Sequence, residues 1–281
     1  MNKISIFIAC HKPYNGIQNT VYTPIHVGRT ISKYKDEMAE MIGDDTGENI
    51  SEKNPYYSEM TAQFWAWKNV KDTEYIGFCH YRRFFEKTFT ETNIDNFFKD
   101  GTDVILAGPV LRDFGRWNML KTFINSEDLA IMLYAVKKLY PEYYQTLSEY
   151  AYGYVDYPLN MLICKKEVFD GYAKWVFDIL FECEKHIRLS PYSRAKRVFG
   201  YISEFLLPIY FIHNHYKIKP LRYMMVSGQL IGGIRKIGAF KMKLIDFIFW
   251  RNKKKPSLKV DYSIKTGLEA DKILSFENLN L

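Results

Sequence analysis

The chain has 281 residues, of which 47% are hydrophobic and 25% are charged, as in a globular protein that buries a sizeable core. This composition excludes disordered, collagen-like, coiled-coil and disulfide-framework proteins, and no apolar run reaches the roughly 20 residues of a membrane-spanning helix. Lys and Arg outnumber Asp and Glu by 39 to 32, a net charge of +7. Such a surplus is compatible with nucleic acid, anionic lipid or phosphorylated substrates as partners, and its position along the chain decides among them.

Four short apolar runs predict strands of a buried sheet, at residues 4–9, 75–79, 103–107 and 159–164. Three of the four cysteines close such runs, and none forms a C-x-x-C pair, which indicates reduced cysteines in a cytoplasmic protein.

Helical patterns lie between these runs. Asn54-Pro55 predicts a helix start, followed by one buried face at Tyr57, Met60, Phe64, Trp67 and Lys71. Ser126 is expected to cap a second helix with a buried stripe at Leu129, Leu133, Val136 and Tyr140. A third stripe comprises Tyr172, Val176, Ile179 and Cys183. The alternation predicts an α/β fold, a mostly parallel sheet flanked by helices, whose ligands bind beyond the carboxyl ends of the strands.

Two polar segments early in the chain are candidate ligand sites. Cys10 and His11 end the first strand and could hydrogen-bond a base or ribose, or form an ordinary turn. The loop at residues 43–51 holds Asp44, Asp45 and Asn49, which could bind a metal, a ribose or a sugar hydroxyl, or simply shape a surface turn.

His80, Arg82 and Arg83 follow the second apolar run directly. A guanidinium fork matches the oxygens of a phosphate group, so this cluster favours a diphosphate ligand over a plain surface arginine pair. Phosphate-binding glycine motifs of the P-loop and dinucleotide types are absent.

Later polar residues suit sugar chemistry. Asp156, Tyr157 and Asn160 bracket the fourth run, where ring faces could stack on a sugar and polar groups could meet its hydroxyls. Glu204 lies in an otherwise apolar stretch and is either a general base or a salt-bridge partner of Arg194 or Arg197.

The sequence resembles a known family at several of these places. Residues 44–69 (DDTGENISEKNPYYSEMTAQFWAWKN) and 75–85 (YIGFCHYRRFF), then 157–180 and 200–207, are similar to the glycosyltransferase-like domain of capsular, exopolysaccharide and O-antigen gene clusters, formerly a domain of unknown function. The resemblance covers roughly residues 3–225. It implies a GT-A-type fold and transfer of a sugar, often a form of galactose, from a UDP-sugar onto a growing glycan.

The sequence departs from the GT-A pattern at one point. Most such enzymes carry Asp-x-Asp at the end of the strand that matches residues 75–79, where Mn²⁺ or Mg²⁺ holds the diphosphate, but His80-Tyr81-Arg82-Arg83 stands there instead. Either Arg82 and Arg83 replace the charge of the ion, which we favour, or Asp44 and Asp45 hold an ion.

These residues define a hypothesis for the reaction. Cys10, His11, Asp44, Asp45 and Asn49 would surround the nucleoside, while His80, Arg82 and Arg83 would bind the diphosphate. Tyr157 and Asn160 would hold the sugar or the acceptor. Glu204 is the first candidate to take the proton of the acceptor hydroxyl in an inverting displacement, and Asp156 is the second.

The chain is expected to divide into a catalytic domain at residues 1–225 and a basic extension at residues 226–281. The stretch from Arg235 to Lys255 contains eight basic residues and one acidic residue, Asp246. It therefore carries a net charge of 8 − 1 = +7, and the rest of the chain is neutral. Helical spacing there predicts an amphipathic membrane anchor on the inner face of the plasma membrane, or a helix docked on the protein itself. The residues expected at the membrane are Phe240, Lys243, Phe247, Trp250, Arg251, Lys253, Lys254 and Lys255.

The expected partners are therefore a UDP-sugar donor, a glycan or polyprenyl-linked acceptor and an anionic membrane. The location of the charge argues against nucleic acid. The alternative is a non-catalytic module that binds nucleotide sugars or glycans with a degenerate site.

Overall fold

The structure is a computed structural model that describes residues 2–232, 257–277, 279 and 281. Its centre is a sheet with the strand order β10-β6-β9-β4-β1-β2-β3. Neighbours are parallel except at β9, which runs antiparallel to both β4 and β6. These strands are β1 (Asn2–Cys10), β2 (Tyr22–His26), β3 (Ile42–Gly43), β4 (Thr73–His80), β6 (Val104–Ala107), β9 (Leu162–Lys165) and β10 (Ile218–Leu221).

A short antiparallel extension continues the sheet beyond the end of β4. β5 (Arg83–Phe85) folds back on β4 and pairs with β11 (Tyr223–Met225), which pairs with β12 (Leu230–Ile231). A separate ribbon joins β7 (Val110–Leu111) to β8 (Val155–Asp156). The carboxyl ends of β1, β2, β4 and β6 therefore lie at one edge of the sheet, beside the start of β9.

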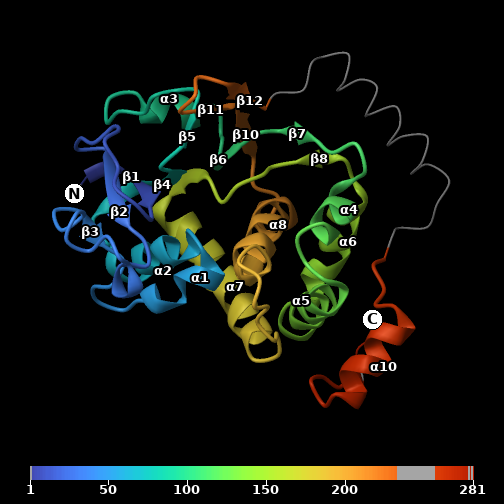
Figure 1. The fold of residues 1–281 in the computed structure, drawn as a ribbon. Helices are drawn as coiled ribbons and strands as arrows, with labels where there is room; N and C mark the ends of the chain where they lie inside the picture. The colour runs from blue at the N-terminus through green and yellow to red at the C-terminus, as the bar shows by residue number, and fades with distance from the viewer. Residues whose placement is uncertain (1, 233–256, 278, 280) are drawn as a thin grey trace.

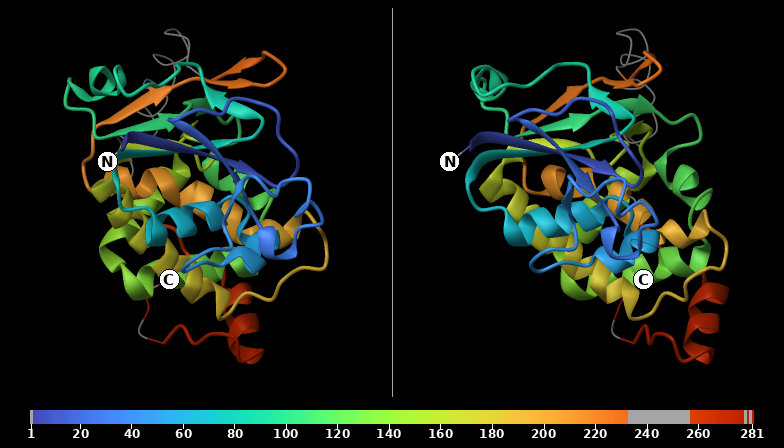
Figure 2. Two further views of the ribbon diagram at one scale, coloured as in Figure 1. Left: turned by 90° about the vertical axis from the view of Figure 1, so that its left-hand side faces the viewer. Right: turned by 60° about the vertical axis from the view of Figure 1, so that its left-hand side comes forward.

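Helices cover one face of the sheet (Figures 1 and 2). They are α1 (Asn54–Tyr57), α2 (Met60–Asn69), α4 (Arg116–Lys121), α5 (Ser126–Leu139), α6 (Tyr144–Tyr152), α7 (Lys166–Glu184) and α8 (Val198–His213). Short 3-10 turns are η1 (Arg29–Ile31), η2 (Ser51–Lys53), η3 (Pro141–Tyr143) and η4 (Ala195–Arg197). On the opposite face, α3 (Ile94–Phe98) packs over Ile4, Ile6 and Ile8.

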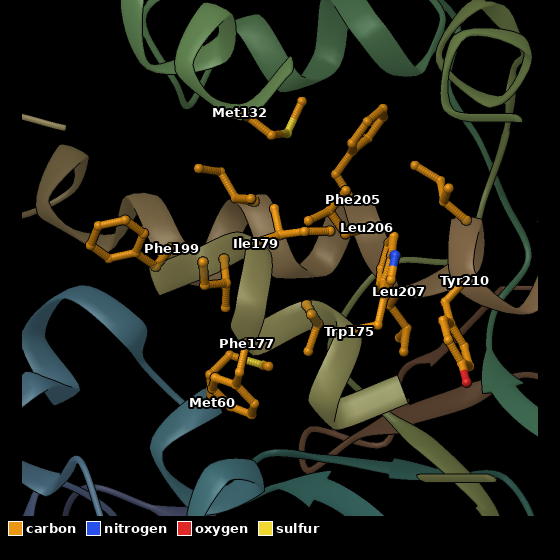
Figure 3. Close-up of a cluster of buried hydrophobic side chains, with 14 of the residues drawn as sticks. Met60, Met132, Trp175, Phe177, Ile179, Phe199, Phe205, Leu206, Leu207 and Tyr210 are labelled. Atoms are coloured by element: carbon orange, nitrogen blue, oxygen red, sulfur yellow. The ribbon is translucent and has the colours of Figure 1, made fainter. Parts of the chain in front are cut away.

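The main core lies between the sheet and these helices. Side chains of α7 and α8 fill the space between Met60 of α2 and Met132 of α5 (Figure 3). The residues of the predicted α7 stripe, Tyr172, Val176, Ile179 and Cys183, are all fully buried. Many of the aromatic residues pack in this core. The ring centroids of Tyr57 and Phe199, for example, lie 4.6 Å apart.

The predicted α/β fold class, a mostly parallel sheet flanked by helices, is confirmed. The runs at 4–9, 75–79 and 103–107 form β1, β4 and β6, while the fourth run becomes a strand only from Leu162. The cap of α5 is Asn125, not Ser126, since the Asn125 side chain accepts the Asp128 N–H at 2.7 Å. The predicted single helix from Asn54 is wrong, because the chain breaks at Ser58 (φ 54°) between α1 and α2.

The described end of the chain returns to the main core. Leu258, Leu268 and Phe276 are buried there, and the Tyr144 hydroxyl donates to the Leu258 carbonyl at 2.7 Å. Leu268 belongs to α10 (Tyr262–Ala270), which packs against α5. This part of the predicted 226–281 extension is thus packed on the core of residues 1–225.

The predicted membrane residues from Phe240 to Lys255 lie outside the described residues. No helix in the part of the chain that the structure describes is long and apolar enough to cross a bilayer.

Candidate active site

A pocket of about 530 Å³ opens at the carboxyl ends of β1, β2 and β4. We call it the donor pocket, after the donor-binding residues predicted from the sequence that line it. Its lining includes His11 after β1, His80, Arg82 and Arg83 after β4, and Lys196 and Arg197 of η4. Parallel strands point their carboxyl ends at one edge, so residues distant in sequence meet there. The structure brings together four of the eight predicted donor-binding residues, namely His11, His80, Arg82 and Arg83.

Strand alternation decides which residue at the end of β1 meets the donor pocket. Ala9 and His11 line it, whereas the intervening Cys10 is fully buried on the other face of the sheet. The Cys10 thiol donates to the Ile8 carbonyl at 3.3 Å, and burial raises its pKa to about 12. The Cys10 side chain, predicted to bind the donor, therefore does not line this pocket.

The positive charge of the donor pocket comes from side chains other than histidine. Burial lowers the pKa of His80, although Glu59 opposes this shift. Burial also lowers the pKa of His11, helped by Lys12, Arg82 and Arg197. Both imidazoles are therefore neutral hydrogen-bonding groups at neutral pH, and Arg82, Arg83, Lys196 and Arg197 supply the cationic charge.

The break between α1 and α2 forms another wall of the donor pocket. Ser58 and Glu59 lie between α1 and α2, and both line the donor pocket. The Asn54 side chain donates to the Ser58 carbonyl at 2.8 Å and fixes this turn. Gly200 of α8 approaches it closely, since a Cβ on Gly200 would lie 3.1 Å from Ser58 Oγ.

The predicted acidic loop does not line the donor pocket. Asp44 is fully buried, and its carboxylate accepts the N–H groups of Gly28 at 2.9 Å and Arg29 at 3.2 Å and the Ser51 hydroxyl at 2.5 Å. Asn49 caps its own turn by accepting the Ser51 N–H at 3.2 Å. Asp45 lies 4.0 Å from the Arg29 guanidinium. These three residues shape the loop and do not line the donor pocket.

The two aspartates also do not fit a bound divalent ion. The Asp44 oxygens already accept three hydrogen bonds from the protein, which leaves a cation little coordinating capacity. In the described part of the chain, no group of three or more His, Cys, Asp or Glu side chains is arranged to hold a metal.

A second, smaller pocket of about 100 Å³ contains both predicted catalytic carboxylates. Glu204 of α8 and Asp156 of β8 line it together with Arg112 and Arg116. Asp156 is held in place, since its Oδ2 is 2.7 Å from both Nε and Nη2 of Arg112 and its Oδ1 accepts the Tyr150 hydroxyl at 3.0 Å. We call this the carboxylate pocket.

Glu204 has a strongly shifted pKa. Burial raises its pKa from 4.5 to about 7, with contributions from the charges of Glu59 and Asp156, while the Leu159 N–H and Arg112 oppose the shift. A carboxylate that titrates near neutrality can take a proton efficiently at physiological pH. The expected alternative partners are engaged elsewhere: Arg194 donates to the Thr122 carbonyl and Arg197 to the Ser58 hydroxyl, both at 2.9 Å.

The two predicted sugar-binding residues lie behind the pockets. Asn160 is 1% exposed, and its amide donates to Glu59 Oε1 at 2.7 Å and to Ser203 Oγ at 3.1 Å. Tyr157 is half-buried against the main core. Neither residue is among those that line the donor pocket or the carboxylate pocket.

Sequence reasoning missed several residues of the two pockets. Glu59 sits inside a predicted helix, Lys196 was not singled out, and Arg112 and Arg116 follow the third strand without a motif. The cis peptide Gly108–Pro109 marks the turn that leads to Arg112. A polar residue shortly after each strand is the one signal that could have pointed to Arg112.

Comparisons with known proteins agree with this architecture. Residues 5–215 match the family described as a domain of unknown function, DUF4422. Among solved structures, the bifunctional glycosyltransferase WbbM in its apo form is similar, with a TM-score of 0.69 and 28% identity over 84% of this chain and 48% of that one. The present chain thus spans about half the length of that protein. No curated protein matches the sequence. Because the family match covers more than half of the chain, the protein belongs to the DUF4422 family.

Proposed function

We propose that this protein is a glycosyltransferase that moves a sugar from a nucleotide-sugar donor to a glycan acceptor. The observation that carries the proposal is the donor pocket, where four cationic side chains gather at the carboxyl ends of parallel strands. Glu204, whose pKa is raised to about 7, lines the separate carboxylate pocket. The similarity to WbbM, a glycosyltransferase, supports a transferase.

The donor is a UDP-sugar, with a form of galactose as the transferred group, on a GT-A-type scaffold. Arg82, Arg83, Lys196 and Arg197 supply the charge that a diphosphate requires, and the same charge stabilises UDP as it leaves. His11 would contact the nucleoside and His80 the diphosphate, since both line the donor pocket.

The reaction is a direct, inverting displacement. Glu204 takes the proton of the acceptor hydroxyl, the acceptor oxygen bonds to the anomeric carbon, and the bond from that carbon to the β-phosphate oxygen breaks. UDP departs with the bonding electrons. Asp156 is the weaker candidate for the base, because Arg112 and Tyr150 already occupy its oxygens.

The donor site works without a divalent ion in this proposal, because arginine and lysine charges stand where GT-A enzymes use Asp-x-Asp. Transfer in excess EDTA tests this. Full activity is expected, whereas complete loss restored by Mn²⁺ or Mg²⁺ would contradict it.

The acceptor is a polyprenyl-linked or growing surface polysaccharide of a capsular, exopolysaccharide or O-antigen pathway. The protein works at the cytoplasmic face of the membrane, to which the +7 stretch between Arg235 and Lys255 is attracted. Since residues beyond 256 pack on the core, Arg251, Lys253, Lys254 and Lys255 should be replaced by Gln rather than removed by truncation. Unchanged sedimentation with anionic liposomes would refute the membrane contact.

Incubation with UDP-galactose, UDP-galactofuranose and UDP-glucose plus acceptor glycans, read by mass spectrometry, tests the proposed activity. A mass gain of one hexose together with UDP release is expected. Donor binding without transfer would favour a non-catalytic module instead, a candidate supported by the missing Asp-x-Asp motif.

A further inference from the structure

Glu59 is the one acidic side chain among the described residues that line the cationic donor pocket. It lies at the break between α1 and α2, on the wall that faces His80 and Arg197. A carboxylate beside a bound diphosphate would be repelled by it, so its presence in this pocket calls for a ligand group that donates hydrogen bonds.

The carboxylate of Glu59 is held rigidly from behind. Asn160 donates to its Oε1 at 2.7 Å, and the same amide group donates to Ser203 Oγ at 3.1 Å and to the Gly200 carbonyl at 3.3 Å. Gln63 in turn donates to the Asn160 carbonyl at 2.9 Å. A side chain positioned in this way is pre-organised for recognition and loses little conformational entropy when a ligand binds.

The contacts to His80 and Arg197 leave hydrogen-bonding capacity on this carboxylate. His80 Nε2 is 3.9 Å from Oε1 and Arg197 Nη2 is 4.0 Å from Oε2, both beyond hydrogen-bonding distance. A carboxylate has about four acceptor positions, so donors from a ligand can be accommodated. His80 Nε2 is itself buried without a hydrogen-bond partner in the described structure, which indicates a further unsatisfied polar group at the same place.

We infer that Glu59 binds one or more hydroxyl groups of the sugar carried by the donor and thereby selects that sugar, and that Asn160 positions Glu59. Sugar hydroxyls are the hydrogen-bond donors of a nucleotide sugar that lie next to its diphosphate. The charge of Glu59 also acts on Glu204, the proposed base, in the neighbouring carboxylate pocket. This inference rests on the proposed function.

Glu59→Gln tests the inference through binding of UDP-galactose and of UDP, each measured by calorimetry. The variant should lower the affinity for UDP-galactose by about 10- to 100-fold, which is the usual effect of losing hydrogen bonds to a charged group. It should change the affinity for UDP by less than about threefold. Glu52→Gln, which removes an exposed carboxylate on η2, is the matched control and should alter neither affinity.

Two results would overturn the inference. One is an equal loss of affinity for UDP and UDP-galactose, which would assign Glu59 to the nucleotide, and the other is no change in either affinity. If Glu59→Gln lowers the melting temperature strongly, the wild-type protein provides the test with monodeoxy analogues of UDP-galactose. At least one analogue should bind about tenfold or more weakly, and equal binding of all of them refutes the inference. Failure of the wild-type protein to bind UDP-galactose at all would instead refute the proposed donor.

Discussion

Arg112 contacts one oxygen of Asp156 with two guanidinium nitrogens, each at 2.7 Å, and this pair ties the turn after β6 to the segment before β9. Glu204 lies in the same pocket, and within the described part of the chain it forms no such ion pair and accepts the Leu159 N–H. The two carboxylates that the sequence singled out as catalytic candidates therefore differ in environment, and the difference favours Glu204 over Asp156 as the proposed base.

Glu204→Gln should reduce turnover by about 10²- to 10⁴-fold, the usual contribution of a general base, while the affinity for UDP stays unchanged. Asp156→Asn should instead lower the free energy of unfolding by about 1–3 kcal/mol, since Arg112 loses its charged partner in a half-buried site. Single-turnover kinetics and chemical denaturation distinguish the two variants. Near-normal turnover in both would show that neither is the base.

The rate of transfer should rise with pH through about 7, because the Glu204 carboxyl must lose its proton before it can accept one from the acceptor. Stability should respond in the opposite direction. The folded-state pKa lies above the unfolded value of 4.5, so the folded protein holds the extra proton and loses stability as pH rises from about 4.5 to about 7. Glu204→Gln should remove this component from a series of unfolding curves measured across that range.

Arg82→Gln and Arg83→Gln should each lower the affinity for UDP by about tenfold or more, because each removes a charged hydrogen-bond donor from the donor pocket. The matched control is Arg188→Gln, whose guanidinium is exposed and lies 3.7 Å from Asp271, outside the pocket. Titration calorimetry at fixed salt measures all three. Affinities like that of the wild type in both pocket variants would remove the diphosphate from this position.

Asp44→Ala should destabilise the protein by about 2–4 kcal/mol, since it leaves the Gly28 N–H and the Ser51 hydroxyl buried without their acceptor. Asp45→Ala, one residue along, should cost no more than about 1 kcal/mol, because its contact with Arg29 is long and partly exposed. Urea denaturation gives both values. A larger loss of donor affinity than of stability in Asp44→Ala would return that residue to the donor site.

Much of the fold could be read from local patterns. The runs that became β1, β4 and β6 are continuous apolar stretches, and the α7 stripe repeats at helical spacing, so burial alone dictates their structure. The polar residues after β4 could also be placed at a ligand-binding edge, because parallel strands end together. His80, Arg82 and Arg83 line the donor pocket for this reason.

Other features depend on contacts between distant segments. The loop that holds Asp44 and Asp45 has a composition compatible with metal binding. Only the folded structure shows that the Asp44 oxygens already accept hydrogen bonds from Gly28, Arg29 and Ser51. The break at Ser58 is not marked by a helix-breaking residue, and it lies against Gly200, some 140 residues later in the chain.

The sequence by itself determined the fold class, the buried faces, the cationic cluster after β4 and the concentration of net charge in one segment, because these follow from periodicity and composition. Only the tertiary structure decided which polar side chains share a pocket. Glu59, Asn160 and Arg197 come from three separate segments, and their meeting depends on how α8 docks on the turn between α1 and α2. Long-range packing of this kind leaves no local pattern in the chain.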